Sequence, residues 1–304
     1  MEQTTEQARA HESDRQQETM KERKLMKEIT AETISGTVEK LCVKACCHLG
    51  EDVKSLLRQA RKKEESPFGI QILDQLLRNI DTAETEHLPV CQDTGMAVIF
   101  LEIGQDVHII GGGLTDAVNE GVRRGYQKGY LRKSVLTPLK RENTGDNTPA
   151  VLHTEITEGD RMKIIVAPKG FGSENMSRIG MLKPSDGKGG VRKFVLDTVI
   201  RAGASPCPPV ILGVGIGGTM EKAAYLSKKA LLRKAGASNP DPELASLERE
   251  LLASVNKTGI GPQGLGGRTT ALAVSVETFP THLAALPVAV NIQCHVARHA
   301  EAVL

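Results

Sequence analysis

The sequence predicts an α+β, or mixed α/β, fold in which helices pack around mixed and antiparallel sheets. Three observations lead to this class. Apolar residues recur at helical spacing in several segments, short runs rich in branched apolar residues between them are typical of buried strands, and two adjacent strands look like a hairpin within the helix–strand alternation. A chain of 304 residues is long enough for one large domain or two closely joined ones.

The elements follow from these patterns in chain order. Residues 1–24 are polar and lack apolar periodicity, so we expect a disordered tail before a folded domain over residues 25–304. Helical spacing predicts helices over 25–63 (one helix or a pair), 69–80, 114–130, 191–202, 220–232 and 240–255. Apolar runs predict strands over 96–103, 150–156, 161–167, 210–214, 270–277 and 288–292. The turn Glu158-Gly-Asp160 is expected to join 150–156 and 161–167 as a hairpin.

The composition argues against several classes of function. The formal net charge is +2 and only eight residues are Phe or Tyr, with no Trp, so neither a basic patch nor a stacking surface for nucleic acid is expected. No apolar run approaches the ~20 residues of a membrane span, and the N-terminus is too polar for a signal peptide. We therefore expect a cytoplasmic protein without nucleic-acid or membrane partners. Six cysteines in such a compartment serve burial, metal binding or catalysis.

Three of the cysteines have a different context from the others. Cys91, Cys207 and Cys294 lie in predicted loops at strand ends, and prolines stiffen the first two loops. The other three, Cys42, Cys46 and Cys47, fall in an amphipathic helix and are expected to be small buried residues. The loop trio is compatible with simple burial or with a zinc site assembled from distant loops. Three thiolates without a fourth would suit an iron–sulfur cluster with one open iron.

Two glycine-rich segments suggest anion contacts. Gly213–Gly218 fits the dinucleotide pattern G-x-G-x-x-G, but the acidic residue expected about 20 positions later would be Asp241, in a loop. A nucleotide-binding oxidoreductase is thus a remote alternative, as is a non-catalytic metal-bound scaffold. In the segment 168–175, glycines allow close backbone approach and Lys169 adds a positive charge, with Ser173 and Asn175 as hydrogen-bonding side chains.

Six motifs together resemble a known family. They are PVCQDTG (89–95), NTGDNTPA (143–150), PKGFGSEN (168–175), PCPPVILGVGIGG (206–218), GIGPQGLGG (259–267) and THLAALPVAVNIQCHVARH (281–299). In collinear order over about residues 25–304, they resemble the α subunit, or N-terminal catalytic domain, of the class I iron–sulfur fumarate hydratases and L-tartrate dehydratases.

The resemblance implies a [4Fe–4S] cluster held by Cys91, Cys207 and Cys294, with the open iron acting as a Lewis acid. It implies a hydro-lyase reaction of the tricarboxylic acid cycle, the reversible hydration of fumarate to (S)-malate. L(+)-tartrate dehydration is the alternative. The sequences of the motifs PVCQDTGMAV and PKGFGSEN resemble the fumarase branch of the family more than the tartrate branch.

Site residues are carried over by position. The resemblance implies that Asp93 and His282 are catalytic, and it implies substrate contacts from Gln92, Asp93, Arg132, Gly170 and Gly172. Taken without the family, Arg132 could equally be a surface charge and His282 an ordinary loop histidine.

The chain ends ten residues after Cys294. In the fused members of the family a C-terminal domain follows and supplies further active-site groups. We therefore expect a separate β subunit, an assembly of two α–β pairs, and a small dicarboxylate as substrate.

Overall fold

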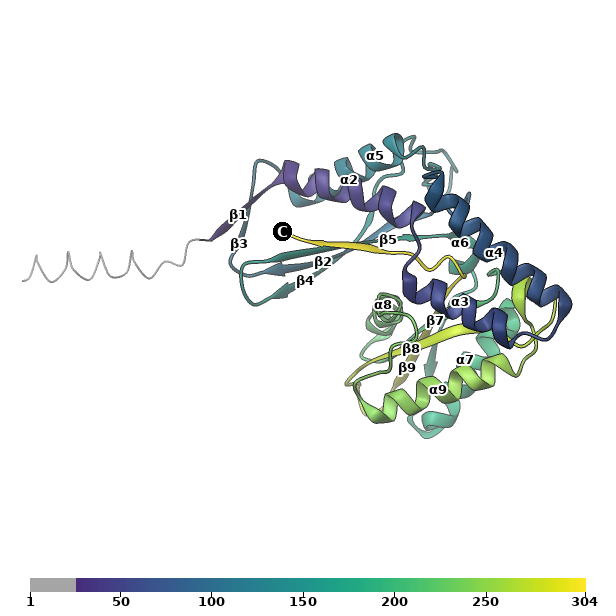
Figure 1. Ribbon diagram of the computed structural model, residues 1–304. Helices are drawn as coiled ribbons and strands as arrows, with labels where there is room; N and C mark the ends of the chain where they lie inside the picture. The colour runs from purple at the N-terminus through teal and green to yellow at the C-terminus, as the bar shows by residue number, and fades with distance from the viewer. Residues whose placement is uncertain (1–25) are drawn as a thin grey trace, which may run out of the picture.

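The computed structural model describes residues 26–304 (Figure 1); the tail expected over residues 1–24 lies outside the described residues. The predicted mixed α/β class is confirmed, because two four-stranded mixed sheets are stacked with helices between and around them. The first sheet has the order β10-β5-β2-β4 and the second the order β6-β9-β7-β8. In Figure 1, α2 and α5 cover the upper sheet, α7 and α9 cover the lower one, and α8 lies between the sheets.

The strand β2 (Met96–Gly104) forms the centre of the first sheet because almost every residue in it is apolar and buried. It pairs antiparallel with β5 (Met162–Lys169) and parallel with β4 (Val151–Thr157). The predicted hairpin is therefore wrong, since β4 and β5 flank β2 instead of pairing with each other. The turn between them passes around the end of β2, where Asp106 N donates to Gly159 O at 2.9 Å.

The long helical segment at the N-terminus is divided into three elements. A short strand β1 (Lys27–Thr30), paired with β3 (Val107–Ile110), precedes α2 (Ala31–Cys47), and α3 (Glu51–Lys63) follows after a break. Thr30 caps α2 by accepting from Thr33 N at 3.1 Å. The helices α2 and α5 (Leu114–Lys128) pack closely on the sheet, and all three cysteines of α2 are buried, as predicted.

The second sheet has helices on both faces. Its strands are β6 (Arg178–Leu182), β7 (Val210–Gly217), β8 (Ala271–Phe279) and β9 (Leu286–Gln293). The outer face packs on α7 (Gly187–Ala202) and α9 (Pro242–Asn256), and the inner face packs on α8 (Met220–Ala230). On its other side, α8 contacts the first sheet, where Tyr225 and Leu232 pack near Phe100. The helix α4 (Pro67–Thr85), longer than predicted, pairs with α3 beside both sheets.

The glycines of the segment 213–218 serve packing and do not form a phosphate loop. Gly213 and Gly215 lie inside β7, not after it, and α8 crosses directly over them. A Cβ added at Gly215 would come within 2.1 Å of Ala223 O, and one at Gly213 within 2.0 Å of Ser227 O. This close helix–strand contact accounts for the pattern that the sequence shares with dinucleotide-binding folds.

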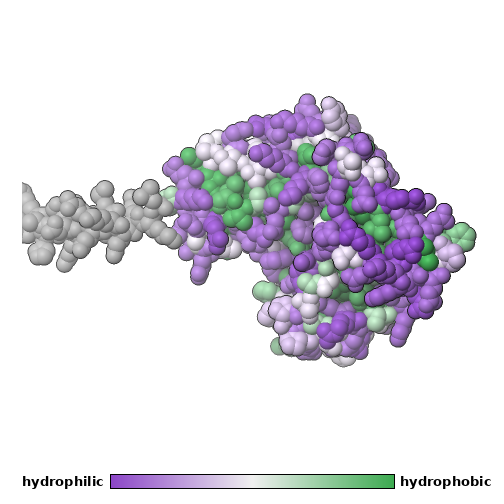
Figure 2. All heavy atoms as spheres, viewed as in Figure 1, coloured by the Kyte–Doolittle hydropathy of each residue, from purple (hydrophilic) through white to green (hydrophobic). Residues whose placement is uncertain are grey.

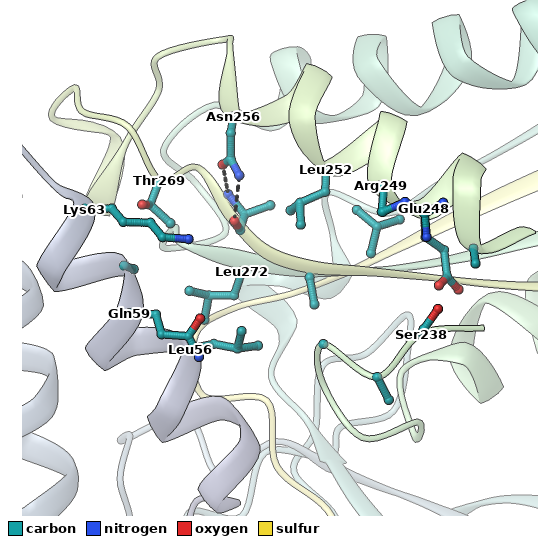
Figure 3. A pocket seen from close by; sticks show the side chains of 17 residues that line it. Leu56, Gln59, Lys63, Ser238, Glu248, Arg249, Leu252, Asn256, Thr269 and Leu272 are labelled. Atoms are coloured by element: carbon teal, nitrogen blue, oxygen red, sulfur yellow. Dashed lines mark hydrogen bonds between the residues drawn. The ribbon is translucent and has the colours of Figure 1, made fainter. Parts of the chain in front are cut away.

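The free edge of β8 is closed by side chains from α9 (Figure 3). Asn256 Oδ1 accepts from Thr270 N and Ala271 N at 2.8 Å each, and Asn256 Nδ2 donates to Ala271 O. Further along, Glu248 accepts from Val276 N at 2.8 Å. The groove of about 400 Å³ between α3 and α9 runs along this edge. These bonds occupy backbone groups through which an edge strand would otherwise pair with another chain.

Four strands were not predicted: β1, β3, β6 and β10 (Ala300–Val303), each of four or five residues. β6 and β10 are edge strands, and their sequences mix polar and apolar residues without a long apolar run. Hydrophilic residues cover most of the face in Figure 2, with a hydrophobic patch near the end of β10 beneath α2. Within residues 26–304, no helix combines the length and apolarity that a bilayer span requires.

We predict that Gly215→Ala lowers the free energy of unfolding by about 3 kcal/mol, because the added methyl group forces α8 away from β7. Urea denaturation would measure the change. The control is Gly189→Ala in α7, where nothing lies within 4 Å of the added atom, and it should stabilise the protein by about 0.5 kcal/mol. Equal stability of the two variants would contradict the packing role of Gly215.

Candidate active site

The strand order brings two of the three loop cysteines to one end of the second sheet. Cys207 precedes β7 and Cys294 follows β9, and these strands are antiparallel with Ile211 opposite Gln293. His295 links the loops, because its Nδ1 lies 3.1 Å from Cys207 O. The strand pairing therefore places the loops of Cys207 and Cys294 side by side at this end of the sheet.

The third cysteine reaches this end from the first sheet. Cys91 lies just before β2, in a loop tied to α4 by a bond from Asn79 Nδ2 to Val90 O at 2.9 Å. Arg298, four residues after Cys294, donates from Nη2 to Asp93 O and so connects the Cys294 loop to the Cys91 loop. Five per cent of Arg298 is exposed, so this cationic link is buried.

The electrostatics link Cys91 to each of the other two thiols. Burial raises the pKa of Cys207, and the nearby Cys91 raises it further. Burial also raises the pKa of Cys294, while the positive charges of Arg298 and Lys169 lower it and Cys91 raises it. Cys91 thus lies within electrostatic range of both other cysteines, and two buried cations favour the thiolate of Cys294.

The three cysteine loops offer a donor set that consists of thiols. Among residues 26–304, no three His, Cys, Asp or Glu side chains come close enough together to hold one metal ion. The three thiols nevertheless surround one end of the sheets, and the neighbouring His295 is turned to a backbone oxygen. A thiol-only set of this kind suits an iron–sulfur cluster, whose ligands bind separate irons and stand further apart than the ligands of one ion.

Asp93 joins the Cys91 loop to the glycine-containing loop after β5. Its Oδ1 accepts from Gly95 N at 3.1 Å, and its Oδ2 accepts from Phe171 N at 2.9 Å. The carboxylate thus lies at the start of the short helix α6 (Phe171–Glu174), where the segment 168–175 was expected to approach an anion. A Cβ on Gly170 would come within 3.1 Å of Asp93 Oδ2, so a larger residue would crowd this contact.

The other predicted substrate residues lie around the same loops. Gln92 is exposed beside Cys91, with Oε1 3.6 Å from the Cys91 sulfur. Arg132 is exposed, and its carbonyl oxygen accepts from Thr94 Oγ1 at 3.1 Å. A Cβ on Gly172 would lie 3.8 Å from Ser205 O, which places this glycine next to the Cys207 loop. The structure therefore brings these residues to the cysteine loops.

Lys169 lies beneath the loop instead of extending into the solvent. It is buried, and its Nζ donates to Ser173 Oγ at 2.8 Å and lies 3.3 Å from Glu174 Oε2. Burial lowers the pKa of Lys169 to about 8, although the charge of Glu174 opposes the shift. Glu174 also pairs with Lys228 of α8 and accepts from Asn291 Nδ2 at 3.0 Å. This network joins β5, α8 and β9 behind the cysteines.

His282 is the predicted site residue that the structure does not bring to the others. It lies in the connection between β8 and β9, and β8 is parallel to β7, so this connection is at the opposite end of the sheet from Cys207 and Cys294. Eight residues of β9 separate the two ends, or about 25 Å at ~3.3 Å per residue. His282 accepts from Ala284 N at 3.2 Å and lines an open groove with β4 and the start of α8.

Comparison with known proteins identifies the family of this chain. The family model described as "Fumarate hydratase (Fumerase)" matches residues 35–303. The chain belongs to this family. It is 45% identical over 276 residues to the Methanocaldococcus jannaschii protein named "Putative L(+)-tartrate dehydratase subunit alpha", covering 88% of this chain and 96% of that protein. It is 35% identical over 248 residues to the L(+)-tartrate dehydratase subunits alpha of Escherichia coli strain UTI89 and Shigella boydii, covering 80% of this chain and 82% of each.

Membership of the fumarate hydratase family makes the chain part of a hydro-lyase. It confirms the resemblance seen in the six motifs. Of the two substrates considered, the family is described by fumarate and the relatives above are named for L(+)-tartrate, so these names leave the choice between them open.

In this member of the fumarate hydratase family, several residues that support the loops of the site were not predicted from the sequence. One of these loops carries Cys207, whose φ of 54° is unusual for a residue with a side chain. The loop around it is supported by Gln263, whose N and Nε2 donate to Pro208 O at 2.7 and 2.9 Å. Glu64, at the end of α3, accepts from Arg268 N at 2.9 Å and from Ser66 N at 3.1 Å. The sequence does contain a local sign of Arg298, because this residue follows Cys294 by four positions within the motif THLAALPVAVNIQCHVARH (281–299).

We predict that Glu64→Gln destabilises the protein by about 2 kcal/mol, because a buried carboxylate that accepts several backbone N–H bonds loses its charge and one acceptor. Chemical denaturation would measure the loss. The matched control is Glu65→Gln, whose exposed ion pair with Arg268 should contribute less than about 0.5 kcal/mol. Similar losses in both variants would show that Glu64 does not anchor the loop.

Proposed function

We propose that this chain is the α subunit of a [4Fe–4S]-dependent hydro-lyase that adds water to, or removes it from, a small dicarboxylate. The observation that carries the proposal is the convergence of the Cys91, Cys207 and Cys294 loops with Asp93 and the loop after β5. Fumarate hydration to (S)-malate is the reaction that the sequences of the motifs PVCQDTGMAV and PKGFGSEN and the family description support. L(+)-tartrate dehydration is the second candidate, because the named relatives support it equally.

Cys91, Cys207 and Cys294 would hold the cluster. When bound, a [4Fe–4S] cluster with an open iron supplies Lewis acidity toward the substrate's hydroxyl group. The reaction needs no redox change. The proposed cytoplasmic location would keep the thiols in a reducing compartment.

The chain's own residues would bind and orient the diacid. Arg132, exposed beside the Cys91 loop, would grip a carboxylate with two parallel hydrogen bonds. The oxygens of Asp93 each accept one backbone hydrogen bond and retain a lone pair, so Asp93 would orient the hydroxyl or water. Gln92 would donate from its amide, and the open backbone at Gly170 and Gly172 would let the substrate approach.

Proton transfer is the step that this chain supplies least directly. His282 lies at the far end of the second sheet, so a role at the reacting carbon would require this loop to come from the second α–β pair of the proposed assembly. A base on the β subunit is the other source. The partner itself is supported by the relatives, which are named as alpha subunits and which this chain spans over 82–96% of their length.

We predict that the anaerobically reconstituted chain is brown but has little hydro-lyase activity, and that a β-type subunit raises its activity at least about 100-fold by completing the site. Fumarate and L-tartrate would be assayed side by side with and without the partner. Higher kcat/KM with fumarate supports the fumarase proposal, and higher kcat/KM with tartrate overturns it. Full turnover by the chain alone would overturn the two-subunit proposal.

We predict that Arg132→Leu raises KM for the preferred diacid about 10- to 100-fold, because one charge-assisted pair to a carboxylate is lost. The visible spectrum of the reconstituted cluster should not change. The adjacent exposed cation Lys133 provides the control, and Lys133→Leu should leave KM within about twofold. Loss of the cluster spectrum in Arg132→Leu would assign this residue a structural role.

A further inference from the structure

Four buried polar atoms behind the cysteine loops have no hydrogen-bond partner. They are Asn291 Oδ1, Gln293 Oε1, and Nε and Nη1 of Arg298. The exposed fraction of each of these three residues is 6% or less, so bulk water does not reach them. An unsatisfied buried donor or acceptor costs about 1–3 kcal/mol, and four of them in one place call for a common partner.

The three side chains line one cavity, together with Lys169 and Lys228. It lies between the first sheet, α8 and β9, and its volume is about 30 Å³. A cavity that holds a water needs at least roughly 10–15 Å³ of such space. The space is therefore large enough for an ordered water.

The orientation of both amides is determined by other contacts. Asn291 Nδ2 donates to Glu174 Oε2 at 3.0 Å, and Gln293 Nε2 lies 3.4 Å from Val296 O. These bonds leave the amide oxygens as acceptors for the cavity. The cavity thus has two acceptors and two donors to satisfy, and water is the small molecule that donates two hydrogen bonds and accepts two. An anion would satisfy the Arg298 donors but would repel both amide oxygens, and the other two cations of the lining, Lys169 and Lys228, already pair with Glu174.

We propose that this cavity holds one ordered water molecule that donates to Asn291 and Gln293 and accepts from Arg298. Through this water, β9 fixes the guanidinium, whose Nη2 bonds to Asp93 O and so positions the loop that carries Cys91, Gln92 and Asp93. Gln293 is then a positioning residue of the site, acting through the water and Arg298. The inference holds for either dicarboxylate.

The first test is a crystal structure of the full chain at a resolution that shows ordered waters. We expect a density peak within hydrogen-bond distance of Arg298 Nε or Nη1 and of both amide oxygens. An empty cavity, or Arg298 bonded directly to the two amides, would overturn the proposal.

The second test measures amide hydrogen exchange at Gly95, whose N–H is held by Asp93. In Gln293→Met we expect exchange about tenfold faster, because one bond to the water is lost and the loop opens more often. In Gln293→Glu we expect the wild-type rate, since a carboxylate accepts from Arg298 directly or through the water. Unchanged exchange in Gln293→Met, or equal exchange in both variants, would contradict the positioning role.

A control separates local opening from general loss of stability. Thr198→Val removes a buried hydroxyl that donates to Phe194 O within α7, outside the residues that line the cavity. It should lower global stability and leave the exchange rate of Gly95 within about twofold of wild type. An equal acceleration at Gly95 in this variant would show that Gln293→Met acts through global unfolding, and the proposal would fail.

Discussion

The antiparallel pairing of β7 with β9 is the constraint on which the candidate site depends. A chain that enters β7 just after Cys207 and leaves β9 just before Cys294 must place the two thiols at one end of the sheet. From there the chain continues into β10, which pairs with β5 of the other sheet. Since β5 ends beside the start of β2, where Met96 lies opposite Lys169, Cys91 approaches the same place. The same strand directions place His282 at the opposite end of this sheet.

Side chain–to–backbone bonds then hold the loops that the strands bring together. Asp93, Arg298 and Gln263 each bond to a backbone group of another loop. A loop has no ladder of its own, so such bonds replace the regular partners that strand residues find in a sheet. Fixed loops matter here because the proposed cluster and a small diacid would both require ligands at defined positions.

Positive charge away from bulk solvent is the second general feature of the site. Lys169 and Arg298, which are buried, and Lys228, which is half-buried, surround the back of the cysteine loops, and Glu174 is the carboxylate that pairs with both lysines. Burying cations is costly unless negative charge compensates them. Thiolates on a cluster and a dicarboxylate substrate would supply that negative charge. The excess of cations is therefore consistent with an anionic cofactor and an anionic ligand.

The sequence by itself determined the mixed fold class, most of the longer elements, the separation of Cys91, Cys207 and Cys294 from the helical cysteines, and the family, because each depends on local patterns or collinear motifs. Only the tertiary structure decided strand order, which depends on contacts distant in sequence. Adjacent strands 150–156 and 161–167 looked like a hairpin, but β2, the most apolar strand of this sheet, lies between them. The glycines of β7 looked like a phosphate loop because close packing against α8 and close approach to an anion demand the same small residue. The far position of His282 was likewise decided by strand direction, and the bond from Arg298 to Asp93 by the meeting of two loops that are distant in sequence. No local pattern encodes either.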